Sequence, residues 1–343
     1  MSCSSAENQQ DSLDRAISLA LESRALDRDA LCAVTGCAGS DLPRLFEGAR
    51  AVRAKYFRQD LHLCAIVNAK SGACTEDCAF CAQSSRHKTD SPRHAFLDPQ
   101  EIGRAASAMK ARGASRFGIV SSGLAPTEAE FAQLLESVRL VREAGLAADV
   151  SVGVLSRERL SRLRDAGLSG VHHNLEVARS FFPQICTTHD YEEDVEAVRL
   201  ALAEGFFVCS GGIFGLGESW EQRAELALTL RELGVSNVPM NFLMPIAGTR
   251  MEHRPVLSAA EALHILALFR LMLPTANLRV CGGRGPVFGP AGGEGQQQLF
   301  ASGASGLMIG DYLTLAGSAP EADLALAREM GLRIVDSSVE PEA

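Results

Sequence analysis

The sequence lacks any apolar run approaching the roughly 18 residues that suggest a membrane-spanning helix, and it lacks a charged N-terminal stretch followed by an apolar segment. A basic excess is also missing, because 42 acidic residues outnumber 33 lysines and arginines and give a formal net charge of -9. This balance offers no basic patch suited to nucleic acid. We therefore expect neither a membrane nor a nucleic acid as a partner.

With ten cysteines among 343 residues, the chain has too few for a disulfide scaffold. The compartment that fits this count is the cytosol, where thiols stay reduced and available to metal. Hydrophobic residues, at 46%, suffice for a large core. Because barrels of alternating strands and helices often exceed about 200 residues as one domain, a single large domain is admissible.

Apolar spacing divides the chain into three parts. Residues 1–55 form an N-terminal extension, in which apolar positions recur at helical intervals and predict two or three capping helices. Cys32 and Cys37 lie there, and they fit buried thiols better than metal ligands. Residues 56–317 form the main domain, and residues 318–343 form a closing helix with an acidic, solvated tail.

Short apolar runs alternate with long amphipathic segments in the main domain. The predicted strands are 61–67, 116–121, 147–152, 170–175, 206–213, 237–243, 278–281 and 306–309. The predicted helices are 99–112, 128–144, 158–166, 191–204, 221–233 and 259–273. This order predicts an α/β fold with a parallel sheet closed as a (β/α)8 barrel of the TIM type, and the alternative is an open doubly wound sheet. A barrel places its active site at the carboxyl ends of its strands.

The loop after the first predicted strand carries the strongest chemical signal. Cys74, Cys78 and Cys81 have CxxxCxxC spacing, and Phe80 directly precedes the last of them. Thiolates this close can converge on one metal centre, and three of them leave one iron of a 4Fe-4S cluster open to a substrate or cofactor. Zinc usually takes four ligands with paired spacing, and no second pair is present. Zinc and three unrelated core thiols are the alternatives.

The spacing and the aromatic residue resemble the signature of radical S-adenosylmethionine enzymes. In that superfamily the open iron binds the amino and carboxylate groups of S-adenosylmethionine, and one electron cleaves the sulfonium to give a 5′-deoxyadenosyl radical. The resemblance implies that Phe80 lies near the adenine. It implies no catalytic acid or base, because the cofactors carry out the difficult chemistry.

Four stretches make the resemblance specific to biotin synthases. They are NAKSGACTEDCAFCAQSSRHKT at 68–89, HHNLE at 172–176, CSGGIFGLGE at 209–218 and NFLMPIAGT at 241–249. The similarity covers roughly residues 56 to 315, which is most of the chain. It implies a homodimeric, cytoplasmic barrel enzyme that inserts sulfur between C6 and C9 of dethiobiotin, the last step of biotin biosynthesis. It also implies a reducing partner such as flavodoxin or ferredoxin.

The resemblance carries roles to single residues. It assigns cofactor binding to Phe80, Asn174, Glu176, Gly211 and Gly212. It assigns substrate binding to Asn174, Asn241 and His172. A carboxylate or amide can share the hydrogen bonds of a vicinal diol, although Glu176 stands where an aspartate is common in the family. Because adjacent strand residues point to opposite faces, we expect His172 to face ligand and His173 to be structural.

The sequence departs from the family pattern at the second cluster. Many biotin synthases hold a 2Fe-2S cluster, the proposed sulfur donor, with three cysteines and one arginine. Cys209 and Arg279 match that pattern, whereas Gly118 and Asp149 occupy the other two positions. A glycine offers no side-chain ligand, and an aspartate oxygen suits iron-sulfur chemistry less than a thiolate does.

In our hypothesis, cysteines elsewhere in the chain replace the two missing cluster ligands. The pattern is similar to a variant group of biotin synthases with further cysteines around the cavity. We expect Cys64, Cys186 and Cys209 to hold an auxiliary cluster, 2Fe-2S or a variant, near Arg279. Cys281 is a further candidate because it lies beside Arg279 on the seventh predicted strand.

Two other classes of function stay open. A barrel enzyme of the hydrogenase-maturation or rearrangement type keeps the first cluster and needs no sulfur donor. A redox sensor or scaffold keeps the cluster and needs no nucleoside pocket. Asn174, Asn241 and the stretch 209–218 favour biotin synthase over both.

Overall fold

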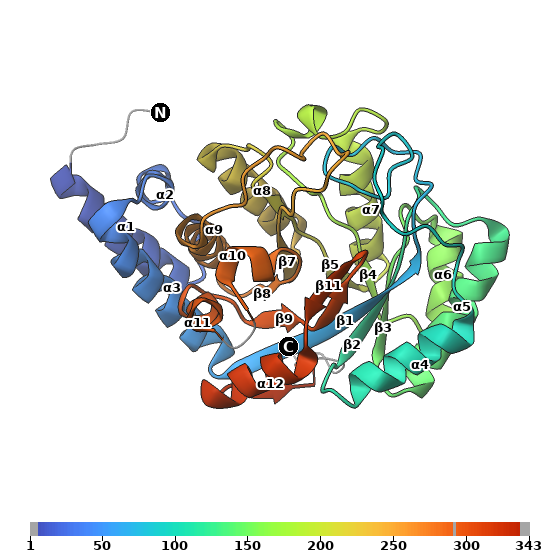
Figure 1. Ribbon diagram of the computed structural model, residues 1–343. Helices are drawn as coiled ribbons and strands as arrows, with labels where there is room; N and C mark the ends of the chain where they lie inside the picture. Colours follow the sequence, from blue (N-terminus) through green and yellow to red (C-terminus); the bar gives the residue numbers. More distant parts are fainter. Residues whose placement is uncertain (1–5, 291–292, 337–343) are drawn as a thin grey trace.

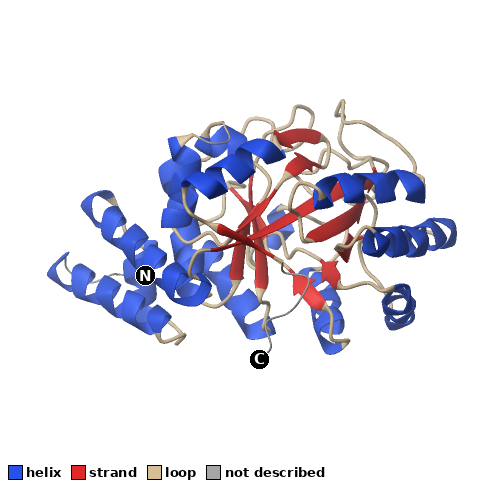
Figure 2. Cartoon of the chain, turned by 90° about the horizontal axis from the view of Figure 1, so that it is seen from below, coloured by secondary structure: helices blue, strands red, loops and turns tan. Residues whose placement is uncertain are grey.

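The computed structural model describes residues 6–290 and 293–336. Eight parallel strand positions form a ring at the centre of the molecule, and helices surround them (Figures 1 and 2). The first four strands are β1 (Asp60–Lys70), β2 (Arg116–Ser121), β3 (Ala147–Ser151) and β4 (Gly170–His172). The fifth position is shared by β5 (Phe207–Cys209) and β6 (Gly212–Phe214), and the last three are β7 (Asn237–Phe242), β8 (Asn277–Val280) and β9 (Gly306–Met308). Pairing of β1 with β9 closes the ring. The predicted (β/α)8 barrel is therefore confirmed, and the open sheet is wrong.

The outer helices follow the predicted order. They are α4 (Pro99–Lys110), α5 (Glu128–Glu143), α6 (Arg157–Ala166), α7 (Tyr191–Ala203), α8 (Trp220–Leu233) and α9 (Ala259–Met272). Local signals set their ends, as α5 illustrates: the Glu130 amide donates to the Thr127 hydroxyl at 3.3 Å, and the Thr127 amide donates to the Glu130 carboxylate at 2.9 Å. At the other end of such a helix, Gly167 closes α6 in the left-handed conformation with φ +96°.

The predicted strand 206–213 is interrupted in the structure. It becomes β5 and β6, which both pair with β7. Close backbone approach at the break admits only glycine, because a Cβ at Gly211 would lie 2.1 Å from the Pro239 carbonyl oxygen. A Cβ at Gly212 would lie 2.3 Å from the Glu176 carbonyl oxygen. The interruption therefore brings the backbone of β6 against the end of β4.

Three N-terminal helices pack beside the barrel (Figure 1). They are α1 (Ala6–Leu21), α2 (Arg28–Thr35) and α3 (Leu42–Phe57). Both α1 and α3 contact α9, and the buried Arg53 guanidinium fastens α3 to the barrel by donating to the Ala304 carbonyl at 2.6 Å. Among the described residues, no helix is long and apolar enough to cross a membrane.

The chain beyond β8 contains elements that periodicity did not predict. They are α10 (Arg284–Phe288), α11 (Glu294–Ala301), the hairpin of β10 (Gly310–Tyr312) and β11 (Leu315–Ser318), and the strand β12 (Arg333–Val335). The predicted closing helix is α12 (Pro320–Glu329), and β12 pairs in parallel with the start of β1. The predicted acidic tail lies outside the described residues from position 337 onward.

Candidate active site

The carboxyl ends of the barrel strands surround a cavity of about 250 Å³, where a barrel fold favours an active site. Thiols, amides, a carboxyl group and a guanidinium contribute to its walls. The predicted site residues that line it are Cys64, Cys74, Phe80, Cys81, His172, Asn174, Glu176, Cys209, Asn241 and Arg279. One cavity thus gathers residues from β1 through β8.

The loop after β1, from Cys74 to Cys81, holds three free thiols close together. The Cys74 amide donates to the Gln83 carbonyl at 3.1 Å, and the Cys81 amide donates to the Cys78 carbonyl at 3.0 Å. Burial raises the pKa of Cys81 to about 11, and the nearby Cys74 adds to the rise. Bound iron stabilises the thiolates that burial disfavours. The donor set therefore fits three-cysteine ligation of a 4Fe-4S cluster.

A chain of hydrogen bonds arranges the polar wall beside that loop. Asn174 Oδ1 accepts from His172 Nε2 at 2.9 Å and from the Gly211 amide at 3.1 Å. Asn174 Nδ2 donates to Glu176 Oε2 at 3.3 Å. The Ile213 amide also donates to the Glu176 carbonyl at 2.8 Å, which ties this wall to β6. These contacts fix the amide of Asn174 and leave the side chains of Asn174 and Glu176 at the cavity surface.

Glu176 is held under two constraints. Its backbone adopts φ +62°, in the left-handed region that residues with a Cβ rarely occupy. Burial raises the pKa of its carboxyl group to about 8, and the charge of Asp194 adds to the rise. The neutral carboxyl group can donate one hydrogen bond and accept others, which suits the two hydroxyls of a ribose.

The two adjacent histidines at the end of β4 face different surroundings, as alternation along a strand predicts. His172 lines the cavity, and burial lowers its pKa to about 4, so its ring is neutral at pH 7. His173 Nε2 instead donates to Asp194 Oδ1 at 2.7 Å. This contact agrees with the structural role expected for His173.

Asn241, at the end of β7, is buried and lines the cavity. Its Nδ2 donates to the Gly212 carbonyl at 3.3 Å, and its Oδ1 accepts from the Gly282 amide at 3.0 Å. These bonds hold the amide plane between β6 and β8. Tyr312 from β10 lines the same cavity, and sequence reasoning missed it because β10 carries no periodic signal.

A second group of thiols lies around Arg279 on β8. Cys64 from β1, Cys209 from β5 and Cys281 after β8 all face the cavity with it. Burial lowers the pKa of Arg279, but the charges of these thiols outweigh that effect and raise the pKa above its ordinary value. Within the described chain, Arg279 Nε and Nη2 have no hydrogen-bond partner. A buried cation with unused donors beside three thiols fits an anionic iron-sulfur cluster.

Comparison with known proteins identifies the family. Residues 68–230 match the model of the radical SAM superfamily, and residues 239–333 match the biotin and thiamin synthesis associated domain. Biotin synthase of Nitratidesulfovibrio vulgaris (strain Miyazaki F) is 48% identical over 312 residues, which cover 88% of this chain and 84% of that protein. The chain belongs to the biotin synthase family. A biotin synthase of Trichlorobacter lovleyi is 44% identical over 316 residues, covering 92% and 94% of the two chains.

A solved structure supports the same fold. Methylornithine synthase superposes with a TM-score of 0.81 at 18% identity and covers 93% of this chain and 97% of its own. As a member of the biotin synthase family, the chain is a radical S-adenosylmethionine enzyme with a 4Fe-4S cluster, which confirms the predicted family and cofactors. A non-enzymatic sensor is excluded.

The structure explains the two departures from the usual biotin synthase pattern. Asp149 is already paired, because Arg116 Nε and Nη2 donate to its two carboxylate oxygens at 2.8 and 2.6 Å. The Arg116 guanidinium also lies 3.5 Å from the centre of the Phe207 ring. At Gly118, a Cβ would lie only 3.1 Å from Ile66 Cγ2. Asp149 is therefore engaged with Arg116, and Gly118 offers no side-chain ligand.

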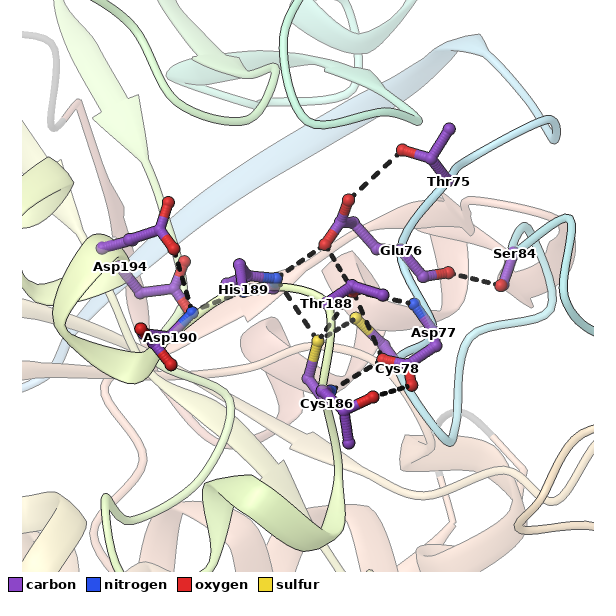
Figure 3. Close-up of polar contacts among 12 residues, drawn as sticks. Thr75, Glu76, Asp77, Cys78, Ser84, Cys186, Thr188, His189, Asp190 and Asp194 are labelled. Atoms are coloured by element: carbon purple, nitrogen blue, oxygen red, sulfur yellow. Dashed lines mark hydrogen bonds and ion pairs between the residues drawn. The ribbon is translucent and has the colours of Figure 1, made fainter.

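The structure does not bring Cys186 to the thiols around Arg279, which differs from our prediction. Cys186 follows the short helix η2 (Phe182–Gln184), and this segment turns back over the cluster loop, where the Ala79 amide donates to the Ile185 carbonyl at 2.9 Å. Cys78 Sγ donates to Cys186 Sγ at 3.9 Å, and this contact lowers the pKa of Cys186 to about 6 (Figure 3). Cys281 takes the predicted place of Cys186 near Cys64 and Cys209.

Proposed function

We propose that this enzyme forms biotin by inserting sulfur between C6 and C9 of dethiobiotin, with its radical source and its sulfur donor on two walls of one cavity. One observation carries the proposal. The cluster loop with Cys74 and Cys81 lines the same cavity of about 250 Å³ as the second thiol group of Cys64, Cys209 and Cys281. A radical enzyme that only rearranges its substrate has no need for that second group.

The first wall is proposed to bind the radical source. Cys74, Cys78 and Cys81 hold the 4Fe-4S cluster, and Phe80 lies beside the adenine of S-adenosylmethionine. When bound, these two cofactors supply a 5′-deoxyadenosyl radical. The supporting geometry is the shared lining of the cavity by the loop and by Phe80.

The adjoining wall is proposed to hold the ribose and the substrate. Asn174 and Glu176 contact the ribose hydroxyls, and Gly211 and Gly212 let the backbone approach the cofactor. The substrate-binding residues are Asn174, Asn241 and His172. An amide such as Asn241 can pair a donor and an acceptor with a ureido group, and its plane is already fixed by Gly212 and Gly282.

The second thiol group is proposed to hold the auxiliary iron-sulfur cluster, 2Fe-2S or a variant, that supplies the sulfur. Cys64, Cys209 and Cys281 are its ligands, and Arg279 either ligates it or donates hydrogen bonds to it. The unused Nε and Nη2 of the buried Arg279 support this role. The enclosed barrel interior keeps water from a reactive radical and orients the substrate between the two clusters.

The remaining parts of the proposal rest on likeness to the biotin synthase family. They are a cytoplasmic homodimer, reduction by a donor such as flavodoxin or ferredoxin, and the division into residues 1–55, 56–317 and 318–343. Packing of α1 and α3 against α9, outside the barrel, supports the first boundary.

The test is anaerobic reconstitution with iron and sulfide, followed by assay with S-adenosylmethionine, a reductant and dethiobiotin. We expect biotin and 5′-deoxyadenosine together, with auxiliary-cluster sulfide lost as biotin forms. If 5′-deoxyadenosine forms without biotin or a thiolated intermediate, the substrate assignment is wrong and the radical chemistry stands.

A further inference from the structure

Three donor atoms of different kinds converge beside the cluster loop, away from the residues that line the main cavity. They belong to Glu76 in the loop, to Cys186, and to His189 before α7. Their ligand atoms all lie within 4.8 Å of one another. Figure 3 shows the three side chains pointing toward one another between the two segments.

The spacing of these atoms suits a small metal ion. Glu76 Oε2 lies 2.7 Å from His189 Nδ1, and Cys186 Sγ lies 3.3 Å from the same nitrogen. Tetrahedral zinc with bonds of about 2.0–2.3 Å holds its ligand atoms roughly 3.3–3.7 Å apart, so the Cys186–His189 separation already suits an ion. Glu76 Oε2 now accepts a hydrogen bond from His189 Nδ1, and it must move away by about half an ångström to admit the ion. Cys186 is 3% exposed, and the side chains of Glu76 and His189 are each 12% exposed. The donors therefore lie at a partly desolvated position.

A carboxylate behind His189 orients its ring. His189 Nε2 donates to Asp194 Oδ2 at 3.2 Å, while Asp194 Oδ1 accepts from His173 Nε2 at 2.7 Å. Asp194 is thus held from a second side, and it turns Nδ1 of His189 toward Cys186 and Glu76. A histidine that ligates metal through one nitrogen and donates to a carboxylate through the other is the usual arrangement in metal sites.

We propose that Glu76, Cys186 and His189 bind one divalent transition-metal ion, with zinc as the preferred ion. A thiolate, an imidazole and a carboxylate are all established zinc ligands. A hollow of about 420 Å³ lined by Cys186 and His189 gives the ion a path of entry and gives a water molecule room as the fourth ligand. Because Cys78 is assigned to the 4Fe-4S cluster, it is not counted among the ligands.

The ion clamps the cluster loop from outside. Asp77 already ties the loop to the segment before α7, since its carboxylate accepts from the Thr187 amide at 2.8 Å and from the Thr187 hydroxyl at 2.6 Å. A metal bond between Glu76 and the pair Cys186 and His189 adds a second tie across the same two segments. This proposal does not depend on the identity of the substrate.

The test uses the full-length enzyme with its iron-sulfur clusters reconstituted, titrated anaerobically with zinc chloride and desalted. We expect one tightly held zinc per chain with no loss of iron. X-ray absorption at the zinc edge then shows one sulfur at about 2.3 Å and nitrogen or oxygen ligands at about 2.0–2.2 Å.

Variants decide between this site and other zinc ligands. In Cys186→Ser the sulfur contribution at zinc disappears, and His189→Gln independently loses the bound zinc. Asp194→Asn keeps the ligands but weakens zinc binding about 10–100-fold because the ring loses its support. Cys37→Ser, which changes another buried thiol, retains zinc. Circular dichroism checks that each variant is folded.

Three results overturn the proposal. They are no zinc retained by the wild type, unchanged zinc in both Cys186→Ser and His189→Gln, and zinc uptake matched by an equal loss of iron. The last result places zinc on the cluster cysteines. Since the readout is zinc content and coordination, a failure of biotin formation leaves this test unaffected.

Discussion

At the scale of single residues, Arg279 indicates which thiols can act together. Cys64, Cys209 and Cys281 line the cavity with it. The Arg279 guanidinium is buried and lies among these thiols, whose charges raise its pKa. A positive charge kept permanently inside a barrel is costly unless anions share the site. Burial raises the pKa of each of these three thiols, and the Arg279 charge opposes that rise.

Cys281→Ala is expected to remove the auxiliary cluster and nothing else. The variant loses the iron and acid-labile sulfide of the auxiliary cluster and no longer forms biotin. It still forms 5′-deoxyadenosine, because the 4Fe-4S ligands remain. Cys186→Ala is the matched control, since that thiol lies beside Cys78 instead. Iron and sulfide analysis with product assay checks this. Loss of auxiliary iron in Cys186→Ala, but not in Cys281→Ala, contradicts it.

Glu176 predicts a dependence of stability on pH. Its pKa rises from 4.5 to about 8 because burial disfavours the charged form and Asp194 repels it. The folded chain therefore keeps a proton that the unfolded chain releases, so the stability contributed by Glu176 is complete below pH 4.5 and is lost as pH rises through about 8. Glu176→Gln mimics the protonated group.

We expect the wild type to lose more thermal stability than Glu176→Gln between about pH 6 and pH 9, because only the wild type must ionise a buried group. Calorimetry or circular dichroism on both proteins at matched ionic strength measures the difference. An equal loss in both proteins shows that Glu176 titrates normally.

At the scale of elements, most of the barrel follows from apolar periodicity. The strand predicted at 116–121 is β2 with the same bounds. Each predicted outer helix begins and ends within two residues of the observed helix. The break between β5 and β6 could not be predicted, because it lies where Pro239, a residue on β7 distant in the sequence, comes close to Gly211. The position of Cys186 beside Cys78 could not be predicted for a related reason: its segment turns back toward Ala79, and sequence spacing contains no record of that turn.

Gly211→Ala tests the break directly. The new methyl group meets the Pro239 carbonyl oxygen at 2.1 Å, so β5, β6 and β7 must shift, and such overpacking typically costs about 1–3 kcal/mol. The shift also disturbs the bond from the Gly211 amide to Asn174, so S-adenosylmethionine binding weakens. Urea denaturation and equilibrium binding measure the two effects.

Gly285→Ala is the matched control for this substitution. Gly285 lies in α10, and a Cβ there meets no atom within 4 Å. Its one conflict is with the next residue, Pro286, because proline disfavours the helical conformation for a preceding residue with a Cβ, so we expect a smaller loss of stability than in Gly211→Ala. Equal destabilisation by both substitutions contradicts the steric account.

At the scale of the whole molecule, a buried ion pair joins α10 and α12, two helices that follow β8. Arg284 in α10 donates to both carboxylate oxygens of Asp323 in α12, at 2.7 and 2.6 Å. The Arg284 side chain is 4% exposed and that of Asp323 is 0% exposed. Sequence patterns predicted the helix but not its attachment, since the partner residue lies in an element that periodicity missed.

Asp323→Ala is expected to cost about 3–5 kcal/mol, because it leaves the buried Arg284 charge without its carboxylate and with only the Gln296 side chain to accept from it. Glu321→Ala changes the same helix and removes an exposed pair with Arg112, which typically contributes at most about 1 kcal/mol. Chemical denaturation of the two variants measures the contrast. Similar losses in both show that α12 is attached by other contacts.

The pairing of β1 sets when the barrel can close during synthesis of the chain. β1 pairs with β2, but also with β9 and β12 near the other end of the chain. His62 emerges from the ribosome long before its partner Gly306, by roughly 10–50 s at about 5–20 residues per second. Through that interval the edge of β1 stays unpaired, and Cys64 waits for Arg279 and Cys281 to be made. The three thiols can therefore meet Arg279 only after residue 281 has been made, when most of the chain already exists.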